Sequence, residues 1–371
     1  MRLNLTAIAL CTLGLLAGGP ARAEDYLIAT ATPLTGSCAQ DGTSLMNGAM
    51  VAADYINAKG GIRGHKIKLI SEDDGGDPKQ AATLANKLVN NKDVLAVLGH
   101  YNSSCTLAGA PIYNRAKVVE CSPASSSPAV SNAGPYTCRV EVTDAQQGAF
   151  VCKWMVKDRG LKKIAILWEN DDYGLGLRQV AEKAIPELGG QVVDVESYYM
   201  GETKDFSSII TKMRGTNPDG IFIGGLYNES ALIRKQMADE GWDPPFFGTE
   251  GLYSDAYPNL GGQAVEGTYF IGYWFPESPL PMVQEFRKLF QAKFHRDPGG
   301  FDANGFDAML VVAKALELCP NPSRATLRDY LWKQHVMGVT GDNTFDAHGD
   351  VTMKVPSKLM VKGGKIVLAK N

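Results

Sequence analysis

From residue 24 onward, short β-rich apolar runs alternate with longer segments of helical periodicity. The first pair is a strand at 26–31 and a helix at 43–58. The same rhythm restarts after a helix beginning at Asp144. Strand–helix alternation of this kind predicts βαβ units and parallel sheets, so two successive runs predict an α/β fold with two Rossmann-like lobes. The expected strands are 26–31, 66–70, 94–98, 117–121, 163–168, 191–197 and 220–223.

The C-terminal third breaks this pattern, because three expected helices have few strands between them. Helices without strands of their own need a sheet to cover, so we expect this region to pack back on the first lobe. The chain then crosses between the lobes more than once. A closing hairpin at 358–361 and 365–368 turns at Gly363-Gly364. The expected helices are 281–295, 303–318 and 323–332.

One local signal is especially clear, at Asp77-Pro78-Lys79-Gln80. Aspartate suits the N-cap, proline suits the first helical position, and glutamine at the third position is placed to reach back to the cap. The four residues therefore predict the start of a helix.

The first 23 residues have the pattern of an export signal. Arg2 provides a positive start, residues 3–17 form the apolar stretch, and Ala21-Arg22-Ala23 is a small-residue cleavage site. We expect a signal peptide over 1–23, which is cleaved after export. The apolar run is too short to span a bilayer. Cys11 lies inside that run, so a lipid anchor is not expected.

Composition then narrows the class of protein. The 371 residues are 44% hydrophobic and 21% charged, which excludes a disordered chain and predicts two globular domains. The net charge is −3, so the chain as a whole does not attract the negatively charged phosphates of a nucleic acid. Six of the seven cysteines follow the signal, so disulfides are permitted, and their pairing stays open. None of them forms a CxxC motif, so a zinc or redox site is not indicated.

Enzyme and metal signatures are missing from the sequence. It has no GxSxG, HExxH or P-loop motif, so we expect no enzyme, cofactor or metal. The acidic segments 72–74 and 342–350 are interpreted as solvated loops, because the second lacks the glutamate that closes a calcium loop. A hydrolase that uses Ser103 with His100 is a weaker alternative.

The turns that follow the strands hold the informative residues. Hydroxyls crowd the turns at 99–104 and 122–128, where strand ends and helix N-termini suit a carboxylate. The second lobe offers Tyr173, Tyr227 and Glu250 at its own turns. A tyrosine covers an apolar ligand body, and the glutamate accepts from an ammonium group. If the turns converge, they predict an α-amino acid ligand.

The chain resembles the leucine/isoleucine/valine-binding proteins, the type I periplasmic solute receptors of ABC importers. This resemblance implies two lobes with parallel-sheet cores and a three-crossing hinge. Lobe 1 would comprise 24–143 and 274–353, and lobe 2 would comprise 144–273 and 354–371. The motifs that carry the resemblance are 57–62, Asp73-Asp74, 77–81, Gly99-His100, Ser122-Pro123, Tyr173-Gly174 and Glu250-Gly251.

The resemblance also implies roles for individual residues. Ser103, Ala124 and Ser126 match the positions that hold a ligand carboxylate. Ala124, Tyr227 and Glu250 match those that hold the ammonium, and Tyr173 matches a tyrosine that closes over the ligand. The full set of candidate ligand-binding residues is Asp41, Asn102, Ser103, Ala124, Ser125, Ser126, Tyr173, Tyr227, Glu250 and Gly251.

The chain departs from the family pattern at two places. Asp41 or a neighbour aligns with an aromatic residue over the ligand side chain, so a purely aliphatic pocket is in doubt. A family disulfide joins the segments that here contain Gly76 and Asn102, so that bridge is absent. The alternative pairs considered are Cys38 with Cys105 and Cys121 with Cys138.

The resemblance implies a monomeric periplasmic binding protein that delivers an amino acid, branched-chain or related, to an ABC permease. The second interpretation is a sensory receptor of the same fold for a small amide or organic acid. The sequence does not decide which ligand is bound.

Overall fold

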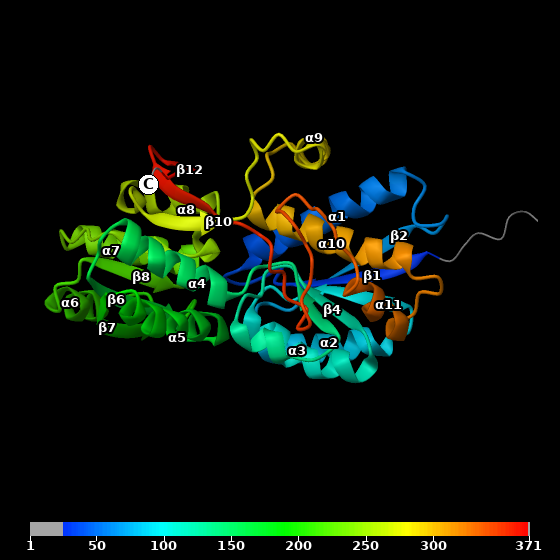
Figure 1. Ribbon diagram of the computed structural model, residues 1–371, viewed down its shortest axis with the longest axis horizontal. Helices are drawn as coiled ribbons and strands as arrows, with labels where there is room; N and C mark the ends of the chain where they lie inside the picture. The colour runs from blue at the N-terminus through cyan, green and yellow to red at the C-terminus, as the bar shows by residue number, and fades with distance from the viewer. Residues whose placement is uncertain (1–24, 370–371) are drawn as a thin grey trace, which may run out of the picture.

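The structure is a computed structural model that describes residues 25–369, and the predicted signal peptide lies outside them. Two lobes lie side by side along the longest axis of the molecule (Figure 1). Each has one sheet covered by helices on both faces, which confirms the α/β class with two parallel-sheet cores. None of the helices within the described range is long and apolar enough to cross a bilayer.

The first lobe has a five-stranded sheet in the order β2-β1-β3-β4-β5, with every neighbouring pair parallel. Helices α2 and α3 cover one face, where the side chains of Ala29 and Ala31 meet those of Leu84 and Tyr113. The elements are β1 Tyr26–Thr32, α1 Ala39–Ala58, β2 Ile67–Asp73, α2 Pro78–Asn90, β3 Val94–Gly99, α3 Ser103–Ala116, β4 Val119–Ser122 and β5 Thr137–Arg139.

The second lobe has a seven-stranded sheet in the order β12-β11-β10-β9-β8-β6-β7. The C-terminal hairpin joins its edge antiparallel to β10, and the other pairs are parallel. The elements are α4 Asp144–Lys153, β6 Lys163–Glu169, α5 Asp172–Glu187, β7 Gln191–Tyr198, α6 Ser207–Gly215, β8 Gly220–Gly224, α7 Tyr227–Asp239, β9 Phe246–Gly248, α8 Ala256–Gly261, β10 Tyr269–Gly272, β11 Ser357–Lys362 and β12 Lys365–Leu368.

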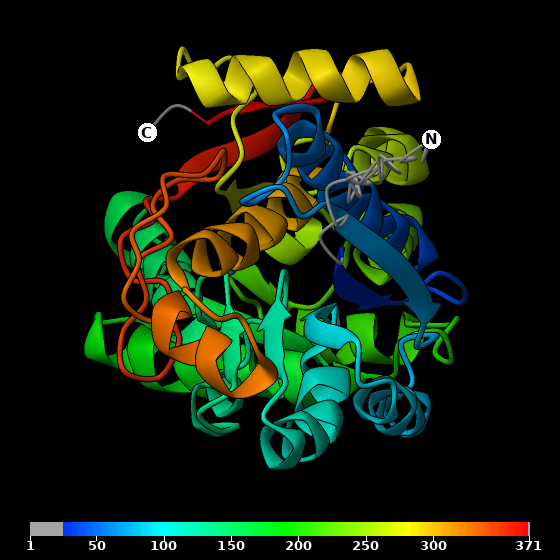
Figure 2. The same ribbon diagram turned by 90° about the vertical axis from the view of Figure 1, so that its right-hand side faces the viewer.

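Three C-terminal helices return to the first lobe, as the missing strands predict. They are α9 (Pro281–Phe294), α10 (Gly300–Leu318) and α11 (Arg324–Leu331). Their buried side chains belong to the same core as those of α1, β1, β3 and β4. Figure 2 shows α9 lying over α1 on the outside of this lobe.

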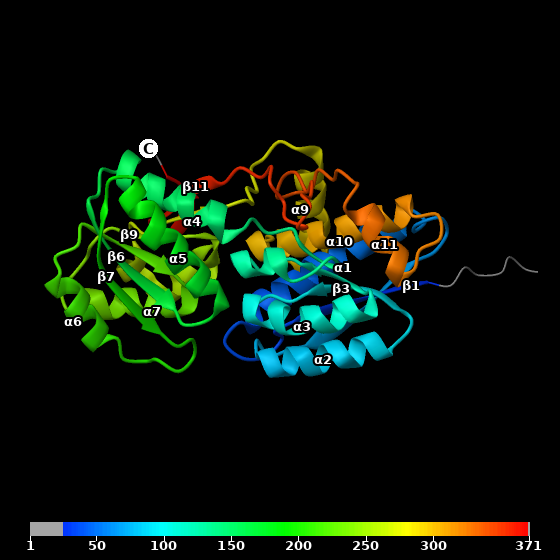
Figure 3. The same cartoon turned by 60° about the horizontal axis from the view of Figure 1, so that its bottom comes forward.

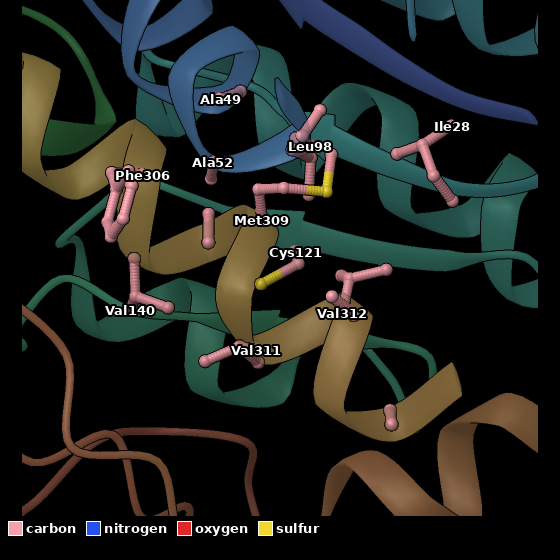
Figure 4. Packing of buried hydrophobic residues seen from close by; sticks show 14 of the residues in the cluster. Ile28, Ala49, Ala52, Leu98, Cys121, Val140, Phe306, Met309, Val311 and Val312 are labelled. Atoms are coloured by element: carbon pink, nitrogen blue, oxygen red, sulfur yellow. The ribbon is translucent and has the colours of Figure 1, made fainter. Parts of the chain in front are cut away.

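Helix α10 packs beside α1 on the same face of the sheet, where Phe306 and Met309 belong to one core with Ala52 and Leu98 (Figure 4). Two glycines permit this close approach. A Cβ on Gly48 would lie 1.8 Å from the carbonyl oxygen of Asp302, and one on Gly305 would lie 2.0 Å from that of Leu45. The two helices are therefore in backbone contact, and the start of α10 is held firmly against the first lobe.

Some helices and strands begin or end at residues other than those that the sequence pattern predicts. Helix α1 begins at Ala39, four residues before the expected start at 43, and β2 extends to Asp73. At α2, the Asp77 side chain accepts from the backbone N–H groups of Lys79 and Gln80, which confirms the predicted cap. The expected return bond from the Gln80 side chain does not form, because that side chain lies against Gly75.

Candidate ligand-binding site

Each lobe has a point in its sheet where the strand order reverses. In the first lobe it lies between β1 and β3, and in the second it lies between β6 and β8. Loops leaving the carboxyl ends of such strands diverge to opposite faces and leave a crevice between them, where α/β proteins bind ligands. Figure 3 shows these ends of the two sheets turned toward the junction of the lobes.

A cavity with an empty volume of about 330 Å³ lies at this junction. Both lobes contribute, so the turns that the sequence predicted do converge. Seven of the ten candidate residues line it: Asn102, Ser103, Ala124, Ser126, Tyr173, Glu250 and Gly251. The remaining lining residues are Tyr101, Asp171, Leu226 and Phe301.

Three candidates lie outside the lining. Ser125 is buried behind it, Asp41 lies beneath Tyr101, and Tyr227 is replaced at the cavity wall by its neighbour Leu226. At the start of α7 the cavity is therefore lined by the residue before the predicted Tyr227. Phe301 was missed because α10 begins at Gly300, whereas the periodic pattern placed the start of that helix at 303.

Hydrogen bonds divide the serines of the first lobe into structural and free hydroxyls. The Ser125 hydroxyl lies 3.1 Å from the carbonyl oxygens of His100 and Tyr101 and 2.7 Å from the hydroxyl of Thr106. It therefore ties the two turns together. The Ser126 hydroxyl is buried and makes no hydrogen bond of normal geometry within residues 25–369, although it interacts with the buried Asp144 carboxyl and so opposes the rise in the pKa of that group. A buried hydroxyl without a partner costs free energy unless a ligand satisfies it.

Glu250 faces the cavity from the second lobe, in the helical turn Glu250–Leu252. Its side chain is 7% exposed, and its Oε2 atom has no partner in the described part of the chain. Burial raises the pKa of this carboxyl well above its usual value, and the carboxylates of Glu141 and Asp144 raise it further. The site therefore holds a buried acceptor that a cationic group would stabilise.

Tyr173 covers the cavity from the N-terminus of α5. Its hydroxyl lies 2.8 Å from that of Thr249. A Cβ at position 251 would come within 2.4 Å of the tyrosine hydroxyl, so Gly251 leaves the space that this hydroxyl occupies. The ring and Glu250 are thus held together on one side of the cavity.

His100 is engaged elsewhere, which contradicts the hydrolase alternative. Its Nδ1 atom lies 2.6 Å from Oδ2 of the buried Asp74, and its Nε2 atom lies 3.3 Å from the hydroxyl of Tyr113. The Ser103 hydroxyl accepts from the backbone N–H of Ser127. The two side chains therefore do not form a nucleophile–base pair.

The acidic segment 72–74 is also more ordered than a solvated loop. Asp74 is fully buried against His100, and Asp73 accepts from the backbone N–H groups of Leu34 and Gly75 at 2.8 Å. These carboxylates stabilise the loops around the site. Among residues 25–369 there is no group of three or more His, Cys, Asp or Glu side chains that could hold a metal ion.

The cysteine pairings considered from the sequence are wrong in this structure. All six cysteines of the described range are buried free thiols. The Cys38 sulfur lies 3.5 Å from the sulfur of Met200 in the other lobe and not beside Cys105. Cys121 and Cys138 do sit at paired positions on β4 and β5, but as thiols.

A crevice between two α/β lobes, with hydroxyls on one wall and a buried carboxylate on the other, defines a solute-binding protein that encloses its ligand. The chain belongs to the periplasmic binding protein family, whose model matches residues 26–360. As a member of that family it is a solute-binding protein and not an enzyme.

Relatives in this family are close in sequence over nearly the whole chain. A Leu/Ile/Val-binding protein homolog of Brucella abortus is 32% identical, covering 92% of this chain and 92% of that protein. An amino acid binding protein of Pseudomonas aeruginosa is 31% identical, covering 88% and 87%. The Leu/Ile/Val-binding protein of Escherichia coli is 30% identical, with 89% of each covered.

Solved structures agree with this assignment. A leucine binding protein from Thermotoga maritima superposes with a TM-score of 0.86 at 28% identity, covering 93% of this chain and 97% of that one. The substrate binding protein of a branched-chain amino acid transporter from Streptococcus pneumoniae, in complex with isoleucine, gives 0.85 at 27% identity, covering 92% and 97%.

Proposed function

We propose that this protein binds an α-amino acid between its lobes in the periplasm and delivers it to the permease of an ABC importer. The observation that carries the proposal is the pair of buried, unpartnered polar atoms that share one cavity, Ser126 Oγ and Glu250 Oε2. A hydroxyl and a carboxylate on opposite walls match the two ends of a zwitterion. The leucine and isoleucine named for similar structures support the same ligand class.

The carboxylate of the ligand binds to the first lobe in this proposal. The hydroxyls of Ser103 and Ser126 supply its hydrogen-bond donors, and the backbone N–H of Ala124, which donates to the Ser122 hydroxyl over 3.3 Å in this structure, turns to the ligand as a third. The ammonium group binds to Glu250 and to the carbonyl of Ala124, and Tyr173 covers the ligand from the second lobe. Asn102 and Gly251 complete the wall beside these groups.

Ligand binding drives closure about a hinge, which we place near residues 143–144, 273–274 and 353–354. Strand β5 ends in the first sheet at Arg139, and β6 begins in the second at Lys163. Strand β10 ends at Gly272 before α9 returns to the first lobe, and β11 enters the second sheet at Ser357. The ligand favours closure because it contacts both walls only in the closed state.

Export and delivery complete the proposal. The chain leaves the cytoplasm with the signal peptide 1–23, loses it, and acts as a monomer that presents its closed form to the permease. A thermal-shift screen of the mature protein against the 20 common L-amino acids and a set of small acids and amides tests the ligand class. A true ligand raises the unfolding midpoint, and the stabilisation grows with the logarithm of its concentration once that exceeds Kd. A screen in which only acids or amides without an α-amino group bind would contradict the proposal.

The two adjacent serines provide a matched test of the carboxylate site. Ser126→Ala should weaken amino-acid binding by about 10-fold, because a hydrogen bond to a charged group is lost. Ser125→Ala should mainly lower the unfolding midpoint, because its hydroxyl ties the His100 and Tyr101 turns together. Calorimetric Kd values and thermal midpoints distinguish the two. If Ser126→Ala binds as tightly as the parent protein, the hydroxyl does not hold the ligand.

Binding should also release protons. Burial raises the pKa of Glu250 in the free protein. Its carboxyl therefore keeps its proton at pH values where an exposed glutamate is ionised. An ammonium group favours the ionised form and lowers that pKa, so binding expels the proton and affinity increases as the pH rises toward the free-protein pKa. Calorimetry in buffers of different ionisation enthalpy measures this release. The release should disappear in Glu250→Gln, and its persistence would assign the proton to another group.

A further inference from the structure

One end of the ligand cavity is closed by an aromatic pair. The rings of Tyr101 and Phe301 meet edge to face, with centroids 5.3 Å apart and an interplanar angle of 77°. Both residues line the cavity, as do the apolar side chains of Ala124 and Leu226. In the proposed function the head group of the ligand contacts Ser103, Ser126 and Glu250, so we place the ligand side chain against the aromatic pair.

The hydroxyl of Tyr101 does not face an apolar pocket, because it donates to a carboxylate. Its oxygen lies 2.9 Å from Oδ2 of Asp41, in α1. Asp41 is only 2% exposed and forms no salt bridge with any residue from 25 to 369. Asp41 and Phe301 also line a second, larger hollow, and Phe301 borders both spaces.

The direction of this hydrogen bond fixes what the tyrosine can offer a ligand. A phenol has one proton, and here that proton is committed to the carboxylate. Toward any further partner, the oxygen of Tyr101 can therefore only accept a hydrogen bond. Donation to a carboxylate increases the electron density on that oxygen and strengthens it as an acceptor.

The ionisable groups around Asp41 keep this arrangement sensitive to pH. Burial raises the pKa of the carboxyl to about 7, the hydrogen bond from Tyr101 opposes that rise, and Asp302 of α10 adds to it. The other ionisable groups nearby are the Cys38 thiol and the Tyr227 hydroxyl, both neutral at pH 7 because burial raises their pKa values. At pH 8 the Asp41 carboxyl is therefore ionised and accepts the proton of Tyr101, so the Tyr101 oxygen can act only as an acceptor toward a ligand.

We propose that Tyr101 and Asp41 make the side-chain end of this site selective for amino acids whose side chain ends in a hydrogen-bond donor, with a side-chain amide as the fitting class. A hydrocarbon of the same shape leaves the tyrosine oxygen unsatisfied, and a carboxylate of the same shape repels it. This inference rests on the proposed amino-acid function and specifies the ligand within it.

Isosteric ligands at pH 8 test the inference with the mature protein. Leucine, asparagine and aspartate share one side-chain shape, and homoleucine, glutamine and glutamate share a longer one. Calorimetry gives the Kd of each ligand. In the set whose side-chain length fits the site, the amide should bind at least about 10-fold more tightly than the hydrocarbon and the carboxylate of the same shape. Equal or tighter binding of the hydrocarbon in both sets would overturn the inference.

Variants assign the selectivity to its residues. Tyr101→Phe removes the accepting oxygen and should bring the amide-to-hydrocarbon affinity ratio close to one. Asp41→Asn retains the shape but removes the charge, and should reduce the ratio in the same direction. Asp54→Asn, an exposed carboxylate on the same helix, is the matched control and should retain the parent ratio. A ratio that both Tyr101→Phe and Asp41→Asn leave unchanged would also overturn it.

The failure of this inference differs from the failure of the proposed function. If no amino acid of either set or of the wider screen binds, the amino-acid function is wrong. If leucine or homoleucine binds well and its amide isostere does not, the function stands and the selectivity assigned to Tyr101 and Asp41 is wrong.

Discussion

Glu250→Gln is expected to weaken amino-acid binding by at least about 10-fold, and by up to about 100-fold if the carboxylate makes two bonds to the ammonium. The glutamine retains the shape of the side chain but removes the charge that compensates the buried cation. The free protein should fold at least as well as its parent, because the carboxylate is buried with an oxygen that has no partner in the described chain.

Calorimetry with the tightest ligand from the amino-acid screen measures this effect, and the thermal midpoint without ligand checks the fold. Glu187→Gln, at an exposed position at the end of α5, is the matched control and should bind like the parent protein. An affinity for Glu250→Gln within about twofold of the parent value would remove this residue from the ammonium site.

Gly305→Ala is expected to lower the free energy of unfolding by about 2 kcal/mol or more, because overpacking a close contact costs that much even when the neighbours relax. The added methyl group would lie 2.0 Å from the backbone oxygen of Leu45, which no side-chain rotation can relieve. Helices α1 and α10 must separate, and Phe301 at the start of α10 then shifts at the ligand cavity. Reduced amino-acid affinity should accompany the loss of stability.

Gly215→Ala provides the control for this substitution. It lies at the end of α6, and a Cβ there has no atom within 4 Å among the described residues. It should therefore be neutral, or stabilising by up to about 1 kcal/mol through better helix propensity. Urea unfolding of the three proteins gives the comparison. Similar stabilities for Gly305→Ala and Gly215→Ala would mean that the helices are not held in backbone contact.

Much of the fold was predictable because each local pattern agreed with the tertiary arrangement. The cap at Asp77 formed as predicted, and the helices after residue 281 covered the sheet that they needed. Strand β9 was not predicted because its three residues are too few to show an alternating pattern. Helix α1 begins before its apolar periodicity does, because Ala39 and Asp41 face the lobe junction and not the core.

The candidate site was predicted at the level of loops and less well at the level of atoms. Serines after β3 and β4 pointed to two turns that line the cavity. Which hydroxyl is free depends on partners distant in sequence: Ser125 meets His100 and Thr106, and Ser126 does not. The sequence also does not show whether Leu226 or Tyr227 lines the cavity. The position at which α7 begins decides this, and it places Leu226 at the cavity wall.

The route of the chain has a consequence for its synthesis. The core of the first lobe contains Ile28 and Leu98 from the beginning of the chain and Phe306 and Met309 from its last quarter. A ribosome makes the whole of β6 to β10 between these two contributions. Until α10 emerges, α1 alone covers this apolar face of the first sheet and leaves part of it exposed. The nascent chain must therefore be kept from aggregating until nearly its full length has been translated.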